Sequence, residues 1–88
     1  MDDYTVTFAR SARKELERLD SGLVSRIFPK IESLARQPHP KGSRKLQGEK
    51  NLWRIRIGDY RIIYTISSEK RMVDIIAIRH RSDAYRKR

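Results

Sequence analysis

Two runs of β-branched and aromatic residues, 52–57 and 60–66, flank the dipeptide Gly58-Asp59, and this pattern predicts a β-hairpin. Side chains alternate between the two faces of a strand, so each run has one largely apolar face. If the apolar faces of the two strands coincide, the exposed face carries three arginines: Arg54, Arg56 and Arg61. Like charges on adjacent strands destabilise a sheet. We therefore expect this face to bind an anion.

The remaining segments predict two helices and two more strands. Near the N-terminus, apolar and polar residues alternate as in a strand. The next two stretches have apolar residues at helical spacing, and another strand-like run follows the hairpin. The predicted elements are a strand at Tyr4–Phe8, helices at Ala9–Leu19 and Leu23–Arg36, and a strand at Met72–Arg79. The loop Gln37–Asn51, with a short extended piece at Lys45-Leu46, joins the helices to the hairpin, and Ser82–Arg88 forms a short basic tail.

The break between the two helices is short, so they are expected to form an antiparallel helical hairpin. Asp20 or Ser21 can cap the second helix. Pro29 lies inside that helix and removes one backbone donor. Either the helix is kinked there and held by the packing of its apolar stripe, or two short helices break near Phe28.

The element order β-α-α-β-β-β predicts an α+β fold, in which a small antiparallel sheet packs on the N-terminal helical hairpin. At 88 residues, the whole chain (1–88) is expected to be one domain. The first strand can pair with the last, as an edge or beside it. The last strand is apolar on both faces, as a central strand would be.

The net charge of +10 is concentrated in one half of the chain. Residues 1–40 carry 7 basic and 6 acidic side chains, whereas residues 41–88 carry 14 and 5. This asymmetry favours nucleic acid or another polyanion as a partner, although a solvated basic surface is the alternative. The chain has no cysteine, no apolar run long enough for a membrane helix and no signal-peptide pattern at its start. We expect a soluble cytoplasmic protein.

More cations are expected near the arginine face. Arg79 and Arg81 share a parity and can join it, with His80 and Tyr85 near its rim. The loop before the hairpin and the tail add further cations, and an ordinary surface connection is the alternative for the loop. The candidate RNA- or ribosome-binding residues are Lys41, Arg44, Lys45, Lys50, Arg79, Arg86 and Lys87.

The residue types present suit phosphate chemistry without a metal or cofactor. There is no glycine-rich phosphate loop and no metal-ligand spacing, and the basic half has few carboxylates. Arginine binds phosphate through its planar fork but keeps its proton. His80 is the better general base by pKa, although a structural histidine is the alternative. Tyr60 and Tyr64 share the inward face of their strand, so a place in the core is the stronger interpretation for both.

The chain resembles the RelE group of the RelE/ParE toxin superfamily. The resemblance covers nearly the whole chain and rests on Leu46-Gln47-Gly48, on residues 52–64 (Leu-Trp-Arg-Ile-Arg-Ile-Gly-Asp-Tyr-Arg-Ile-Ile-Tyr), on His80-Arg81 and on Tyr85. It implies a toxin that enters the ribosomal A site and cleaves mRNA there, with the 2′-OH as nucleophile and a cyclic phosphate left on the upstream fragment. It also implies a cognate antitoxin that wraps the toxin in a hetero-oligomer able to bind operator DNA.

Carried over by position, the candidate catalytic residues are Arg54, Arg56, Arg61, Arg81 and Tyr85. The resemblance implies that Arg61 and Arg81 hold the scissile phosphate and that Arg81 can protonate the leaving oxygen. Arg54 and Arg56 stand where some members have lysines. Because arginine holds its proton, the base role moves to His80 or Tyr85.

Two other functions remain open on the sequence. A ParE-like inhibitor of DNA gyrase would be a non-enzymatic poison on the same fold, and such chains generally lack the full arginine-plus-tyrosine set. A plain RNA-binding module would grip the backbone with steep salt dependence and no cleavage.

Overall fold

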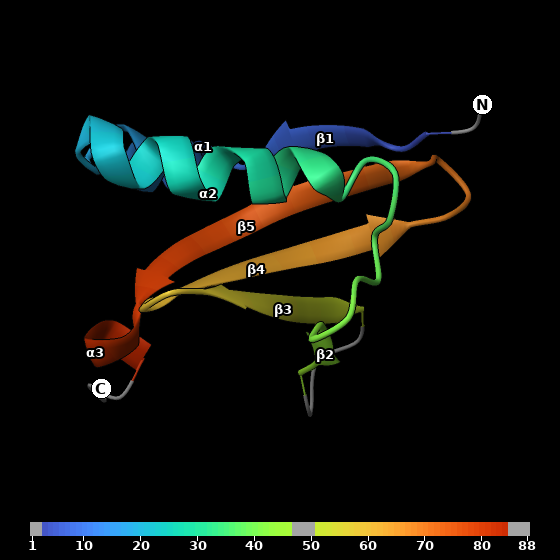
Figure 1. Cartoon of the computed structure of the whole chain (residues 1–88). Helices are drawn as coiled ribbons and strands as arrows, with labels where there is room; N and C mark the ends of the chain where they lie inside the picture. Colours follow the sequence, from blue (N-terminus) through green and yellow to red (C-terminus); the bar gives the residue numbers. More distant parts are fainter. Residues whose placement is uncertain (1–2, 47–50, 85–88) are drawn as a thin grey trace.

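The computed structural model describes residues 3–46 and 51–84, and these form a sheet with a helical layer on one side (Figure 1). Tyr85, Arg86, Lys87 and Lys50, four of the candidate residues, lie outside the described ranges. The elements are β1 (Thr5–Phe8), α1 (Arg10–Glu17), α2 (Ser21–Ser33), β2 (Arg44–Lys45), β3 (Leu52–Ile57), β4 (Tyr60–Ser67), β5 (Met72–His80) and α3 (Arg81–Ala84).

The sheet has the strand order β1-β5-β4-β3-β2. The pairs β2–β3, β3–β4 and β4–β5 are antiparallel, as expected, whereas β1 runs parallel to β5. The sheet is therefore mixed, and the expectation of an all-antiparallel sheet was wrong for β1. The helical hairpin explains the direction, because it returns the chain to the end where β1 began: the Tyr4 N–H donates to the Ala35 carbonyl at 2.7 Å.

The two helices form the expected hairpin. The Asp20 side chain caps α2 by accepting a hydrogen bond from the Leu23 N–H at 2.9 Å. Pro29 lies within a continuous α2, so the alternative of two short helices breaking near Phe28 was wrong. Among the described residues, no helix is both long and apolar enough to span a membrane.

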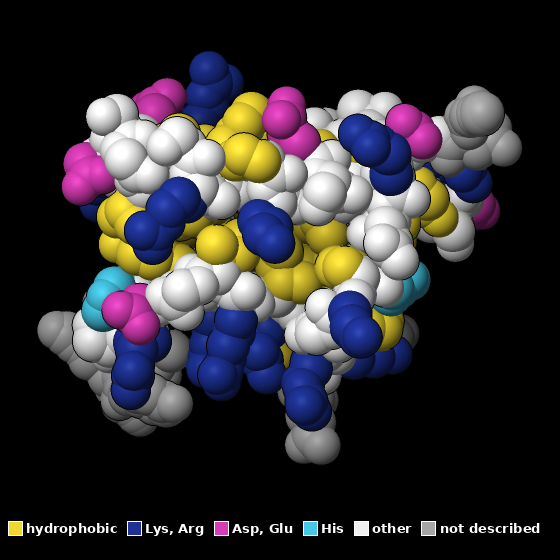
Figure 2. Space-filling view, viewed as in Figure 1, with side chains coloured by type: hydrophobic (Ala, Val, Ile, Leu, Met, Phe, Trp, Pro, Cys, Tyr) yellow, Lys and Arg dark blue, Asp and Glu magenta, His cyan; other side chains and the backbone are white. Residues whose placement is uncertain are grey.

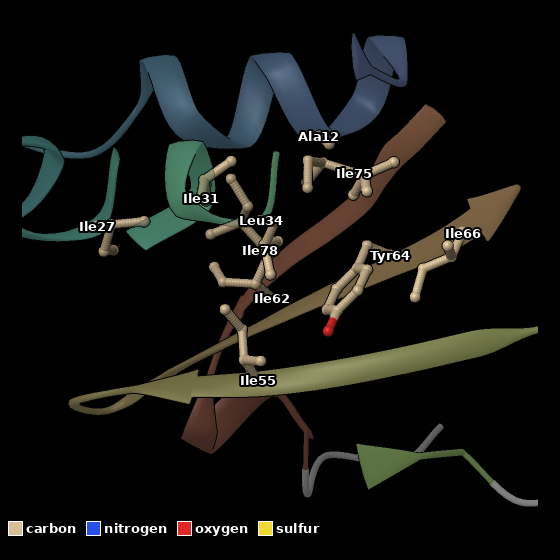
Figure 3. Packing of buried hydrophobic residues seen from close by; sticks show 11 residues of the cluster. Ala12, Ile27, Ile31, Leu34, Ile55, Ile62, Tyr64, Ile66, Ile75 and Ile78 are labelled. Atoms are coloured by element: carbon tan, nitrogen blue, oxygen red, sulfur yellow. The ribbon is translucent and has the colours of Figure 1, made fainter. Parts of the chain in front are cut away.

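The core lies between the helical layer and one face of the sheet (Figure 3). α2 is the main helical contributor: Ile27, Ile31 and its C-cap residue Leu34 have exposures of 1% or less, and Ala12 of α1 is fully buried. The sheet contributes mainly from its three long strands, with Ile55, Ile62, Tyr64, Ile66, Val73, Ile75 and Ile78. The alternation of β3 and β4 decides which side chains enter this core, and it leaves their arginines on the opposite face.

The β3–β4 hairpin is the one expected. Ile57 pairs with Tyr60, so Gly58 and Asp59 form a two-residue turn. Gly58 has φ +60, in the region that glycine adopts without the steric penalty of a Cβ atom.

A register shift follows in β5. Ile63 pairs with Ala77 and Tyr64 pairs with Ile75, so Ile76 is an extra residue, as in a β-bulge. Val73 and Ile75 face the core before the bulge, whereas Ile78 faces it afterwards. Because the bulge changes which positions of β5 face the core, apolar and polar residues do not alternate simply over residues 73–78.

Candidate phosphate-binding site

Arginines from three neighbouring strands stand in one row across the sheet. Arg56 of β3 pairs with Arg61 of β4, and Arg61 pairs with Arg79 of β5. One step along β3, Arg54 pairs with Arg44 of β2. The predicted shared face of the three hairpin arginines is therefore confirmed. Dark blue side chains gather beneath the strands, on the side away from the helices (Figure 2).

The row opens into a hollow of about 170 Å³ at the β3–β4 turn. Arg56 and Arg61 line it from the strands, and Arg81 lines it from the start of α3. A backbone contact places Arg81 there, because its N–H donates to the Asp59 carbonyl at 2.7 Å. The structure thus brings three of the candidate catalytic arginines around one space.

The hollow is strongly cationic. Asp59 is the one acidic residue among those that line it. Within residues 3–46 and 51–84, the ion pairs that form involve neither Arg56, Arg61 nor Arg81. Guanidinium forks donate bidentate hydrogen bonds to phosphate oxygens, and preorganised donors stabilise the charge that develops in a phosphorane transition state. The arrangement can therefore bind a phosphodiester and stabilise added charge on it.

Arg79 lies in the same row of arginines, but its side chain forms an ion pair with a helix residue. Its Nη1 lies 3.5 Å from Oε2 of Glu15 on α1, and Oε1 of the same carboxylate accepts the Ile78 N–H at 2.8 Å. β1 pairs with β5 only as far as Ile75. Beyond that point, Glu15 supplies the hydrogen-bond acceptor that a further residue of β1 would otherwise provide to β5. Sequence reasoning missed Glu15. The available signal was its position three residues after the buried Ala12, beside the apolar stripe of α1.

His80 lies on the other face of the sheet. It pairs with Tyr60, and the two rings meet edge to face with centroids 5.1 Å apart. Its Nδ1 accepts the Ser82 N–H at 3.1 Å and lies 2.9 Å from the Ser82 hydroxyl oxygen. His80 lines a neighbouring hollow that shares Asp59 and Tyr60 with the first, so it lies beside the arginine site and not in its lining. Its assignment as a general base stays a prediction.

Tyr64 belongs to the core, as expected. Its ring is fully buried, and its hydroxyl donates to the Pro38 carbonyl at 2.9 Å. Burial raises the pKa of Tyr64 to about 12, against a smaller lowering by a hydrogen bond with Ser43. Tyr60 and Trp53 are partly buried against the same core. Tyr64 is therefore a neutral structural anchor at pH 7.

The loop cations divide between the two faces. Arg44 pairs with Arg54 on the arginine face, whereas Lys45 pairs with Trp53 and so projects on the helix-facing side. Lys41 and Arg44 line a second hollow beside the first. The structure thus separates Lys45 from the cations with which it was grouped, and the roles of all of them remain predictions.

Comparisons with known proteins bear on the whole chain. A family model described as "ParE toxin of type II toxin-antitoxin system, parDE" matches residues 6–85. Toxin RelG of Mycobacterium tuberculosis is 31% identical over 96% of this chain and 98% of its own length.

Two solved structures share the fold. The toxin–antitoxin complex RelBE2 from Mycobacterium tuberculosis gives a TM-score of 0.79 at 30% identity, over 90% of this chain and 99% of that one. The archaeal RelE–RelB complex from Pyrococcus horikoshii gives 0.79 at 28%, over 92% and 97%. The similarity indicated by the hairpin and tail motifs is confirmed.

Proposed function

The chain belongs to the RelE/ParE family of toxins from type II toxin–antitoxin systems, and from this premise we propose that it is a ribosome-dependent endonuclease that cleaves mRNA in the A site. The observation that carries the proposal is the hollow where Arg56, Arg61 and Arg81 meet. We place the activity in the cytoplasm, because translating ribosomes are there.

The proposed reaction uses a nucleophile that the substrate itself supplies. The 2′-OH of one nucleotide loses its proton and attacks the adjacent phosphorus, forming the bond to O2′. The bond to the 5′ oxygen of the next nucleotide breaks, and that oxygen takes up a proton. The products are a 2′,3′-cyclic phosphate and a 5′-hydroxyl, so the chemistry as written needs no metal.

In this scheme the arginines stabilise the negative charge that develops on the phosphate. Arg56 and Arg61 bind the non-bridging oxygens as the phosphorane forms, and Arg81 donates to the leaving oxygen. The protonated guanidiniums cannot accept the nucleophile's proton. Because His80 is not among the residues that line this hollow, we favour Tyr85, which lies outside the described residues, as the group that accepts it.

We extend the antitoxin partner of the two matched complexes to this chain. A groove of about 640 Å³ on the helical hairpin, with Leu16, Leu19, Val24 and Phe28 among its lining residues, supports a protein partner. A neighbouring reading frame should encode an acidic, helix-rich protein. Its co-expression should give a stable hetero-oligomer and restore growth, and a toxin that stays monomeric beside it would contradict this assignment.

The direct test is primer extension on mRNA from a translating extract to which the protein has been added. We expect cleavage in phase with codons, which Arg61→Ala and Arg81→Ala remove, while Arg18→Ala at the end of α1 serves as the matched control. A 2′-O-methyl group at the cleaved position should block the reaction. A free 3′-hydroxyl on the upstream fragment would contradict 2′-OH attack.

The description of the matching family model favours one second candidate, a ParE-like inhibitor of DNA gyrase. This function predicts intact mRNA in the same extract and trapped gyrase–DNA complexes in a cleavage assay. The two results are mutually exclusive for a single mode of action, so the pair of assays separates them.

A further inference from the structure

A second cationic hollow adjoins the first. It has a volume of about 490 Å³ and is lined by Lys41, Gly42, Arg44, Arg54, Ile55 and Arg56. Arg56 also lines the hollow at the β3–β4 turn, so the two spaces meet at that residue. All the charged residues that line the second hollow are basic.

The strand register creates this concentration of charge. Arg44 stands opposite Arg54, and Arg54 and Arg56 are two residues apart on the same face of β3. Cα atoms with this separation lie about 6.6 Å apart, which is the scale of one nucleotide step along an extended backbone. The cations are thus arranged along β3 at a spacing suited to successive phosphates.

Lys41 is held beside the strands by contacts made on the opposite face. The Tyr64 hydroxyl binds the Pro38 carbonyl, and the His39 and Trp53 rings meet edge to face at 4.5 Å. The chain then turns, with the Ser43 N–H donating to the Pro40 carbonyl at 2.9 Å. Gly42 adopts φ +93 within this turn, a conformation that a residue with a Cβ atom rarely takes. The turn therefore presents Lys41 toward Arg44.

We propose that this second hollow is a phosphate subsite, which binds the neighbouring phosphodiester of the same single-stranded RNA whose scissile phosphate occupies the first hollow. The inference rests on the proposed function and deepens it. Lys41 supplies a point charge and Arg44 a bidentate fork, while Arg56 lies between the two phosphates. The subsite positions the strand and takes no part in bond breaking.

The test measures the affinity gained with each added phosphate. Short 2′-O-methyl RNAs with one, two and three phosphodiesters are titrated into the protein by NMR at fixed salt. In the wild-type protein, the second phosphodiester should tighten binding about fivefold to tenfold, as a charge-assisted contact does. Arg44→Ala and Lys41→Ala should remove most of this gain while leaving the one-phosphate RNA nearly unaffected.

Two control variants distinguish a specific phosphate subsite from general electrostatic attraction by the basic surface. Lys70→Ala removes a lysine from the turn between β4 and β5, and this lysine lines neither hollow. Lys30→Ala removes a lysine from the last turn of α2, on the helical layer. Both should keep the gain from the second phosphodiester. The salt slope of the two-phosphate RNA should fall by about 0.7 in Arg44→Ala.

Several results would overturn the subsite. No gain from the second phosphodiester would do so, as would equal losses in Arg44→Ala and Lys30→Ala. If Lys41→Ala and Arg44→Ala weaken antitoxin binding or ribosome binding but leave the RNA gain intact, the hollow contacts a protein or ribosomal RNA instead. The proposed function is tested separately. If the protein shows no A-site cleavage but keeps the affinity gain from the second phosphodiester, the subsite stands and the nuclease activity does not.

Discussion

Each candidate residue in the first hollow is an arginine, and this limits what the site can do. Arginine keeps its proton in proteins, so the row at Arg56 and Arg61 offers hydrogen bonds and positive charge but no base. The planar fork fixes the direction of those bonds, which a lysine cannot reproduce. The site is therefore suited to holding a phosphate in one orientation and offsetting charge on it.

The difference between a guanidinium fork and a simple positive charge is easiest to measure at Arg61. On programmed ribosomes saturated with toxin, Arg61→Ala should lower the first-order rate of mRNA cleavage by about 10²–10³, the usual effect of losing a preorganised donor. Arg61→Lys keeps the charge but loses the fork, and should recover only part of the rate. Full activity in Arg61→Ala would remove Arg61 from the mechanism.

Tyr64 makes a pH-dependent contribution to stability. Its folded pKa of about 12 exceeds the ordinary value of 10.0, so the folded state binds the proton more tightly. The contribution is complete below about pH 10 and is lost as pH rises through 12, at up to about 1.4 kcal/mol per pH unit. Urea unfolding of wild type and Tyr64→Phe from pH 8 to 12 should give a difference that shrinks across this window. A difference independent of pH would contradict the shift.

At the scale of elements, one carboxylate connects the helical layer to the end of β5. Glu15 accepts the Ile78 N–H and pairs with Arg79, immediately after the part of β5 that β1 covers. Two residues beyond Arg79, β5 passes into α3, where Arg81 reaches the first hollow. Glu15 therefore connects α1 to the segment of β5 that leads to that arginine.

The connection predicts unequal effects of two similar substitutions in α1. Glu15→Ala leaves the Ile78 N–H unpaired and should destabilise the protein by about 1–3 kcal/mol. Glu17→Ala breaks only the exposed pair with Arg13 and should cost at most about 0.5 kcal/mol. Glu15→Gln keeps an acceptor and should lie between them. Equal free energies of unfolding for Glu15→Ala and Glu17→Ala would contradict the role of Glu15.

At the scale of the whole molecule, the fold sorts charge by face. The helices bury the apolar face of the sheet, and the arginines of β3 and β4 therefore share the other face (Figure 1; Figure 2). Residues 41–88, which hold most of the excess positive charge, supply the strands of that face. A field of one sign steers an oppositely charged partner toward the site.

This arrangement predicts a strong effect of salt on association. The rate at which the protein associates with ribosomes, followed by stopped-flow fluorescence, should fall about tenfold or more when salt rises from roughly 50 to 200 mM. The dissociation rate should change less. Neutralising Arg44 should reduce the salt dependence, whereas neutralising Arg18 on the helical layer should not. An association rate insensitive to salt would argue against steering.

The sequence by itself determined the features that depend on local periodicity. Alternation across Gly58-Asp59 was enough to place Arg54, Arg56 and Arg61 on one face, since a hairpin with a two-residue turn fixes both parity and register. The helical hairpin, a cap at Asp20 or Ser21 and the inward position of Tyr64 followed from equally local patterns, and the structure assigns the cap to Asp20.

Only the tertiary structure decided the features that depend on pairing between distant segments. β1 runs parallel to β5, Glu15 completes the β5 edge, and the turn at Gly42 brings Lys41 to Arg44. The bulge at Ile76 turned His80 toward the helices, and the uninterrupted apolar run there gave no sign of the change. Residue type and spacing define a face, but which segments meet on that face depends on contacts that no local pattern contains.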